Sequence, residues 1–426
     1  MSRSIQSRPP ARLILAAIAV LALAFGGAPS RAQTSATASS PLTLQQAFVQ
    51  AWERQPEARA LAQRRDASQA LRQAAQAWTP EPAALEASVR SDRFNARQDA
   101  RELEFGVAVP LWLPGERRRT QDLADALARG TDAQALLAQW HLAQILRDAW
   151  WTLRRDQEEL AAADTRWQAS QRLSADVARR VKAGELSKAD QHQADGAAAT
   201  AQGEYAQLRA KALASEQSLR ALLGVALDAP LQVAEDAEAE PASDAAGLPH
   251  PQLQSLQAKS LAAKSAAALA RVQSRGNPEL TLLQTRERAA RGEANSGSVT
   301  IGLRFPLGSS DKHRAAIANA GAEQIEAEVA AEREQERLQA SVRSARAALS
   351  AARTVLATSS ERARLAEESR SFFDKSFRLG ETDLPTRLRV ELEAATAQRE
   401  QARARIEVHH AIATLRQALG LLPGQP

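Results

Sequence analysis

The chain has 426 residues, no cysteine and a formal net charge of +5, with 55 lysines and arginines against 50 aspartates and glutamates. The lack of cysteine excludes disulfides, thiol catalysis and Cys-based zinc sites. Aromatic residues make up 4% of the chain and charged residues 25%, a balance that favours long helices in coiled-coil packing over thick globular cores.

Residues 1–32 have the pattern of a secretory signal peptide. Arginines precede an apolar run from Leu13 to Phe25, and Ser30 and Ala32 are small residues where a signal peptidase reads the chain. We predict cleavage after Ala32. A membrane-spanning helix is the alternative, but the run of about 13 residues is shorter than the roughly 20 that such a helix needs. An exported chain without cysteine also has no N-terminal Cys for a lipid anchor, so we expect the fold itself to attach it to a membrane.

The predicted leader also changes the charge balance. It contains four arginines and no acid, so the remaining residues have a formal charge of +1. The basic isoelectric point of the whole chain therefore does not indicate a nucleic-acid partner.

An internal repeat with a constant offset of 196 residues runs through the rest of the chain. It relates Gly106 to Gly302 and Gly184 to Gly380, and it also relates these further pairs: Pro82 and Pro278, Pro110 and Pro306, Leu146 and Val342, Gly224 and Gly420. We infer two copies of one unit, residues 33–227 and 250–420. The acidic, proline-containing stretch 228–249 is predicted to connect them, and 421–426 to be a short tail.

Within each unit the pattern begins as a helix, at about 42–78 and 251–274, and then changes to alternation. Each alternating run has a partner run before it, at 83–90 and 279–286, across a polar loop, which predicts one β-hairpin per unit and four strands per chain. The apolar side of the alternating runs consists of Leu103, Phe105, Val107, Val109, Val299, Ile301, Leu303 and Phe305.

The alternation also indicates a membrane. Small or polar residues occupy the opposite side of both runs, as expected when one face of a barrel meets lipid and the other a wet lumen. Two hairpins packed on a soluble domain are the alternative. Because four strands cannot close a barrel and open sheet edges are not tolerated in hydrocarbon, several copies must contribute, and three would give twelve strands.

A very long helical pattern follows each hairpin, at about 117–182 and 312–378, which corresponds to roughly 100 Å at 1.5 Å per residue. The apolar residues of the second pattern step by four and three, which is a coiled-coil seam. Return helices are predicted at about 186–223 and 384–419. The fold class is thus mostly α with a transmembrane β part.

The whole mature chain resembles the TolC family of outer-membrane efflux proteins. The resemblance rests on the opening Leu42-Thr43-Leu44, on the strand exits Val109-Pro110-Leu111 and Phe305-Pro306-Leu307, and on the duplicated helical turns. It implies a homotrimer with a twelve-stranded barrel in the outer membrane and a helical tunnel through the periplasm. It also implies a periplasmic adaptor (membrane fusion protein) and an inner-membrane pump as partners, in an efflux pump or a type I secretion system.

The resemblance assigns roles to the two helical turns. It implies that their tips meet the adaptor, which here are Lys182, Gly184, Glu185, Arg378, Gly380 and Glu381; helix capping alone would also explain the two glycines. It places the tunnel gate close by, although Thr386 and Arg389 stand where well-studied members carry aspartates. A closing link from Asp190 to Arg387 or Arg389 is a hypothesis, with ordinary solvated charges as its alternative.

Motifs of enzymes are missing from the sequence. There is no nucleophile elbow, phosphate-binding loop or His-Glu-x-x-His motif, and the adjacent His409 and His410 point about 100° apart on a helix. We therefore expect no enzyme activity, no cofactor and no metal site. The alternatives are a periplasmic adaptor and a structural coiled-coil protein of the envelope. The cargo stays open between drugs, metal ions, solvents and peptides.

Overall fold

The computed structural model describes residues 41–92, 100–226, 231, 233–234, 238–242, 249–308 and 310–425. The predicted signal peptide and most of the predicted connector lie outside these residues. Pro41–Pro426 form one compact unit.

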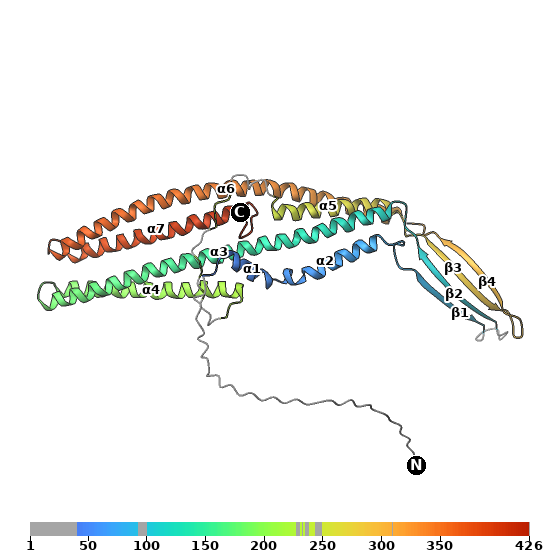
Figure 1. Ribbon diagram of the computed structural model, residues 1–426, viewed down its shortest axis with the longest axis horizontal. Coiled ribbons are helices and arrows are strands. Elements are labelled where there is room, and N and C mark those ends of the chain that lie inside the picture. The colour runs from blue at the N-terminus through green and yellow to red at the C-terminus, as the bar shows by residue number, and fades with distance from the viewer. Residues whose placement is uncertain are drawn as a thin grey trace, which may run out of the picture. The chain divides into compact units, whose positions relative to one another are not determined.

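The unit has the same order of elements twice (Figure 1). The first half contains α1 (Leu44–Glu53), α2 (Pro56–Ala75), β1 (Ala84–Ser91), β2 (Arg101–Pro110), α3 (Glu116–Lys182) and α4 (Lys188–Leu223). The second contains α5 (Pro251–Val272), β3 (Glu279–Arg288), β4 (Ser296–Arg304), α6 (Ser310–Arg378) and α7 (Leu384–Ala418). This confirms the predicted fold class, with long helical hairpins and four strands.

Two boundaries differ from the prediction. The opening helix is split into α1 and α2 around Arg54 and Gln55, because Pro56 disfavours a helical conformation in the residue before it. Strand β4 ends at Arg304, so Phe305 lies one residue beyond it, immediately before Pro306. No helix among the described residues combines the length and the apolar character needed to cross a membrane.

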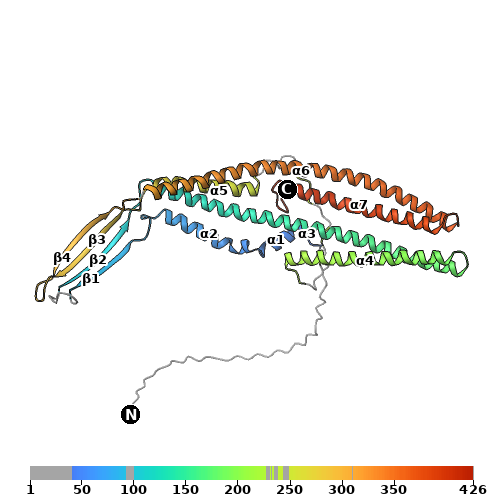
Figure 2. The same cartoon turned by 180° about the vertical axis from the view of Figure 1, so that it is seen from behind.

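The helices pack side by side along their length. α4 and α2 lie against α3, α7 lies against α6, and α5 lies between α3 and α6 (Figures 1 and 2). The sheet lies at one end of the helices, and the turns α3–α4 and α6–α7 lie at the other. The order of elements therefore separates a β end from a helical-tip end.

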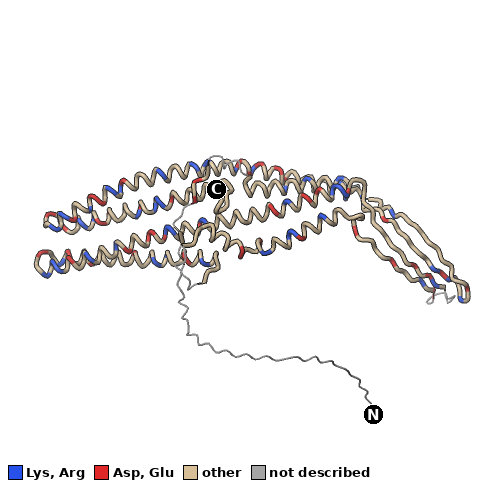
Figure 3. Tube along the Cα trace, in the orientation of Figure 1, with Lys and Arg blue, Asp and Glu red and all other residues tan. Residues whose placement is uncertain are grey.

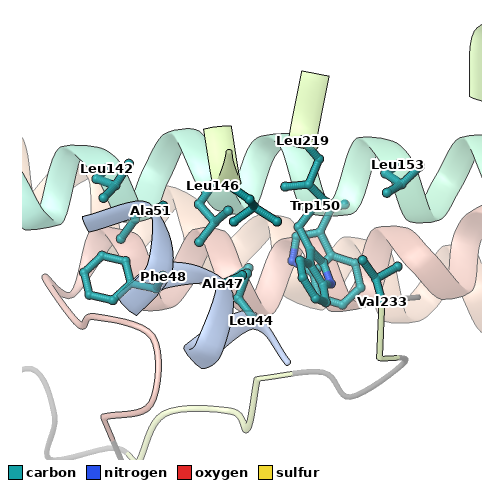
Figure 4. Close-up of a cluster of buried hydrophobic side chains, with 14 of the residues drawn as sticks. Leu44, Ala47, Phe48, Ala51, Leu142, Leu146, Trp150, Leu153, Leu219 and Val233 are labelled. Carbon is teal, nitrogen blue, oxygen red and sulfur yellow. The ribbon is translucent and has the colours of Figure 1, made fainter. Parts of the chain in front are cut away.

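The main core lies where α1 crosses α3 and where α4 ends (Figure 4). Leu146 and Trp150 of α3 are buried against Phe48 of α1 and Leu219 of α4. A second core repeats this arrangement with Leu349 of α6 and the residues around Leu415 of α7. The predicted coiled-coil seam is confirmed, since Ala345, Leu349 and Ala352 are buried there.

Candidate functional site

The four strands form one antiparallel sheet in the order β1-β2-β3-β4. The register places Leu85, Val107, Leu282 and Ile301 in one row across the sheet, and Leu280 opposite Val109 and Leu303. Because side chains alternate between faces, these rows share one face. That face is apolar, and large side chains are exposed on it along every strand: Leu85, Val89, Leu103, Phe105, Val107, Leu280, Leu282, Val299, Ile301 and Leu303.

The opposite face of the sheet is polar and internally bonded. Ser88 donates to Glu104 at 2.8 Å, Arg90 pairs with Glu102 at 3.0 Å, and Ser296 donates to Glu287 at 3.1 Å. The sheet is therefore two-faced, with a continuous apolar surface on one side and a hydrogen-bonded polar surface on the other. Water would solvate the polar face but not the apolar one.

Strands β1 and β4 are the edges of this sheet among the described residues. Each presents a row of backbone N–H and C=O groups to one side. Such rows are templates for pairing with a strand of another chain. Among the described residues, the sheet of a single chain thus has two edge strands and an exposed apolar face.

The junction between sheet and helices is fixed by a buried carboxylate that the sequence analysis did not single out. Glu116, at the start of α3, accepts hydrogen bonds from Leu113 N at 3.0 Å, Asn277 Nδ2 at 2.7 Å and Gln273 Nε2 at 2.9 Å. The last two residues belong to the second half of the chain. Glu116 therefore joins the two halves where they enter the sheet. The repeat gives one signal for it. The equivalent position in the second half holds Lys312, so Glu116 is a position where the two halves differ in charge.

Large apolar side chains are also exposed at this junction. Trp78 and Leu307 are 92% and 93% exposed, while Trp112 donates its indole N–H to Ala77 O at 3.2 Å. Tryptophan with an apolar body and a polar N–H is enriched at membrane–water interfaces.

At the other end of the molecule, the two helical tips have the same backbone. Gly184 and Gly380 have φ of 83° and 78°, a conformation that glycine adopts without strain. Lys182, Glu185, Arg378 and Glu381 are exposed around them. Leu379, beside Gly380, is also exposed although it is apolar.

The tips are connected by a buried ring. Phe377 of α6 is 2% exposed and lies under two guanidinium groups, Arg180 of α3 at 5.3 Å and Arg387 of α7 at 4.7 Å from the ring centre. Arg387 also pairs with Asp374 at 2.6 Å. Because Arg180 and Arg387 come from different helical hairpins, this contact joins the two hairpins near their ends.

The structure does not bring Asp190 to Arg387 or Arg389. Asp190 and Thr386 occupy the same position in equivalent helices, the third residue after the N-cap, where each takes part in capping. Asp190 accepts from Ser187 N at 3.0 Å, and Thr386 N donates to Asp383 at 3.1 Å. Asp190 and Thr386 are thus engaged in local capping, and Arg387 is paired with Asp374. These contacts replace the hypothesised link. Arg389 is exposed.

A buried ion-pair cluster joins α3, α7 and the segment between the two halves. Glu238 accepts from Arg147 at 2.6 Å and 2.8 Å and from Arg416 at 3.1 Å, and both arginines are 2% exposed. Burial lowers the pKa of Arg416, and the negative charge of Glu238 opposes this shift. Among the described residues, no group of three or more His, Asp or Glu side chains is placed to hold a metal ion.

Comparison with known proteins relates this architecture to outer-membrane channels. Residues 243–421 match the family model of the outer membrane efflux proteins. The fold is similar to the CmeC outer membrane channel of Campylobacter jejuni (TM-score 0.73, 12% identity, covering 90% of this chain and 87% of that one). It is also similar to VceC of Vibrio cholerae (TM-score 0.71, 16%, 88% and 96%) and to the open MtrE channel of Neisseria gonorrhoeae (TM-score 0.71, 17%, 89% and 89%). No curated protein sequence matches the chain.

Proposed function

Since residues 243–421 belong to the outer membrane efflux protein family and the described chain has the fold of TolC-type channels, we propose that this chain is one subunit of an outer-membrane exit duct. The duct is passive, and substrates reach it from an inner-membrane transporter through a periplasmic adaptor. The transporter belongs to a tripartite efflux pump or to a type I secretion system.

The two-faced sheet carries this proposal. Its apolar face suits lipid and its polar face a wet lumen, and its edges β1 and β4 would pair with the next copy. Three copies supply twelve strands, an even number within the range of bacterial barrels. A homotrimer therefore completes the sheet that a single chain leaves open.

The helices give this duct its length. α3 has 67 residues, which corresponds to about 100 Å at 1.5 Å per residue. With the sheet in the outer membrane, the helices extend into the periplasm and their tips lie far from the barrel. An exported chain is required, in agreement with the predicted signal peptide.

The tips are the proposed contact with the adaptor. Lys182, Glu185, Arg378 and Glu381 offer charged side chains, and Leu379 offers an exposed apolar one. Charged side chains of both signs at the tips can form complementary contacts with a partner.

For the gate, we retain Arg389 and Thr386 as positions near the narrow end of the duct, and we assign Arg387 a different role. Arg387 holds the two hairpins together through Phe377 and Asp374. Opening of the narrow end would then require the hairpins to separate at this contact.

A periplasmic adaptor and a structural coiled-coil protein are the competing proposals. Neither requires a sheet with a continuous exposed apolar face, whereas a barrel does. No catalytic role is part of the proposal, because a passive duct supplies a path and no chemistry.

Membrane fractionation of the expressed full chain tests the proposal. We expect the protein in the outer membrane, as an oligomer that dissociates into single chains only on boiling. Ile301→Arg on the apolar face should abolish the oligomer, because arginine near the bilayer midplane costs about 2–4 kcal/mol per site. Thr300→Arg, one residue away on the polar face, is the matched control and should assemble. A soluble periplasmic monomer, or equal behaviour of the two variants, would contradict a barrel.

A further inference from the structure

Near the sheet, helix α3 is covered on two sides. On one side lies α2, because Ser68 Oγ and Thr131 Oγ1 are 2.9 Å apart and the buried Ala124 and Ala128 share the stripe of Thr131. On the other side lies α5 (Figure 1). The stripe of α3 toward α5 is buried or half-buried and consists of Leu123, Ala126, Gly130 and Ala133.

Helix α6, the equivalent of α3 in the second half, is covered on one side only in the part of the chain that the structure describes. The offset of 196 residues relates Ala124 and Thr131 to Ala320 and Ala327, which are half-buried and buried on the side of α5. The residues equivalent to the second stripe of α3 are all exposed: Asn319, Ala322, Glu326 and Val329. On this side α6 lacks the neighbour that α3 has.

Helix α2 lacks a neighbour in the same way. Its equivalent α5 lies between α3 and α6, whereas α2 lies against α3 and, among the described elements, otherwise only against α1. Four positions of α5 are half-buried, Ala258, Ala262, Ala266 and Leu269. Their equivalents on α2 are all exposed, Ala62, Asp66, Ala70 and Gln73. The helix missing beside α2 is thus a long helix from the other half of a chain, which is an α6.

The contact of α3 with α5 gives the register of the missing contact. Asp122 of α3 and Ser265 of α5 line one groove between these antiparallel helices. The offset converts this pair into Ala318 on α6 and Gln69 on α2. Asn319 and Ala70, the next residue on each helix, belong to the two exposed stripes. The stripes therefore face each other in this register.

The charges of the two stripes are complementary. Charged residues of both signs are spread along α2 and α6 (Figure 3). In the register above, Glu326 of α6 lies within one helical turn of Arg59, which precedes Ala62 by three residues on α2. Both are exposed, and none of the described residues forms an ion pair with either. The small side chains of Ala62, Ala70 and Ala322 leave room for close approach of the helices.

We propose that α6 of one copy packs against α2 of the next copy as α3 packs against α5 within a chain, with an ion pair between Glu326 and Arg59 of the next copy. The inference rests on the proposed function. Since α2 leads into β1 and β4 leads into α6, pairing of β4 with β1 of the next copy brings these helices side by side. A second copy is the occupant because one chain carries both stripes, in matching direction, register and charge.

Disulfide formation in outer membranes tests the packing. Ala70→Cys combined with Asn319→Cys should give linked chains that survive boiling without reductant, because a disulfide requires Cα atoms within about 7 Å. Asp66→Cys combined with Ala322→Cys, one turn further along, covers a small shift in register. Ala70→Cys combined with Ala320→Cys is the matched control and should stay unlinked, since Ala320 faces α5 of its own chain.

A charge exchange tests the ion pair. Arg59→Glu and Glu326→Arg should each lower the temperature at which the oligomer dissociates, because like charges then face each other between copies. The double variant should recover most of the loss. Damage within a single chain would add up in the double variant instead, so the recovery separates an interface from a merely structural role.

The outcomes separate this interface from the barrel. A heat-dissociable oligomer in which neither cysteine pair links and the double variant does not recover would refute the helical interface and leave the barrel intact. Linkage of these cysteines to a different protein would assign the stripes to that partner and overturn the inference. If the unchanged chain forms no heat-dissociable oligomer, the proposed function fails first, and the interface fails with it.

Discussion

Gly106 on β2 lies directly opposite Leu283 on β3, and a Cβ atom on Gly106 would lie 2.3 Å from Leu283 Cδ2 and 2.9 Å from Leu282 O. Strands β2 and β3 therefore pack together at this point only because residue 106 has no side chain. The repeat places Gly302 at the equivalent position, where a Cβ would lie 2.6 Å from Thr281 Oγ1. Both glycines give room to a cross-strand neighbour in β3.

We expect Gly106→Ala to destabilise the oligomer by about 1–3 kcal/mol, because the methyl group overpacks against Leu283 and a fixed backbone oxygen. The temperature at which the oligomer dissociates on a gel measures the effect. Gly297→Ala in β4 is the control, since its Cβ would meet nothing closer than Thr285 O at 3.9 Å. Equal melting of the two variants would contradict the contact.

The cluster around Glu238 makes a second prediction. Glu238→Gln should cost about 3–5 kcal/mol, because it leaves Arg147 and Arg416 buried without a balancing charge. Glu240→Gln should cost less than about 1 kcal/mol, because Glu240 and its partner Arg353 are both about half exposed. Denaturant unfolding of the two variants makes the comparison, and a mild effect at Glu238 would contradict a structural role for the cluster.

Phe377 and Phe372 both lie on α6, one buried and one exposed, so their substitutions can be compared directly. Phe377→Ala should cost about 3–5 kcal/mol, since it empties the space between Arg180 and Arg387. Phe372 is 66% exposed, so Phe372→Ala should have little effect on a single chain. Hydrogen exchange at the ends of α3 and α6 reports the difference, and unchanged exchange in Phe377→Ala would show that the ring does not hold the hairpins together.

His250 predicts a pH dependence. Burial lowers the pKa of His250 to about 4 from its ordinary value of 6.5. As the pH falls, the unfolded chain therefore binds the proton before the folded chain does. His250 costs no stability above pH 6.5, and it lowers the free energy of unfolding as the pH falls from 6.5 to 4.

His250→Asn isolates that contribution, because asparagine can also cap α5, where Gln252 N now donates to His250 Nδ1 at 3.2 Å. The difference in melting temperature between protein and variant should change between pH 6.5 and 4 and stay constant above. A constant difference across the whole range would contradict a buried neutral histidine. His409, whose pKa burial also lowers, is present in both chains and cancels.

The sequence predicted the fold in large part because the offset of 196 residues compares the chain with itself. Leu103 and Val299, with their alternating neighbours, identified the strands and the apolar face, and Gly184 and Gly380 identified the tips. These features are local, so periodicity and turn chemistry suffice to find them. The boundary at Phe305 was wrong by one residue, for a reason also local, the proline that follows.

The contacts that join the halves could not be predicted in this way. Glu116 with Asn277, Phe377 with Arg180, and Glu238 with Arg416 bring together residues far apart in the chain. Periodicity gives the face on which a residue lies but not its partner across a tertiary contact. Asp190 illustrates the limit, because its charge suggested a gate while its place after Ser187 made it a capping residue.

Cross-linking between copies tests the central claim, that β1 of one chain pairs with β4 of the next. The chain has no cysteine, so any disulfide must come from introduced residues. Ala87→Cys in β1 would be combined in turn with Gly297→Cys, Val299→Cys, Ile301→Cys and Leu303→Cys, the residues of β4 on the same face, and oxidised in outer membranes. We expect at least one pair to give a boiled, non-reduced species of three chains, while each single variant does not. Single chains from every pair, in membranes that contain the protein, would contradict a barrel shared between copies.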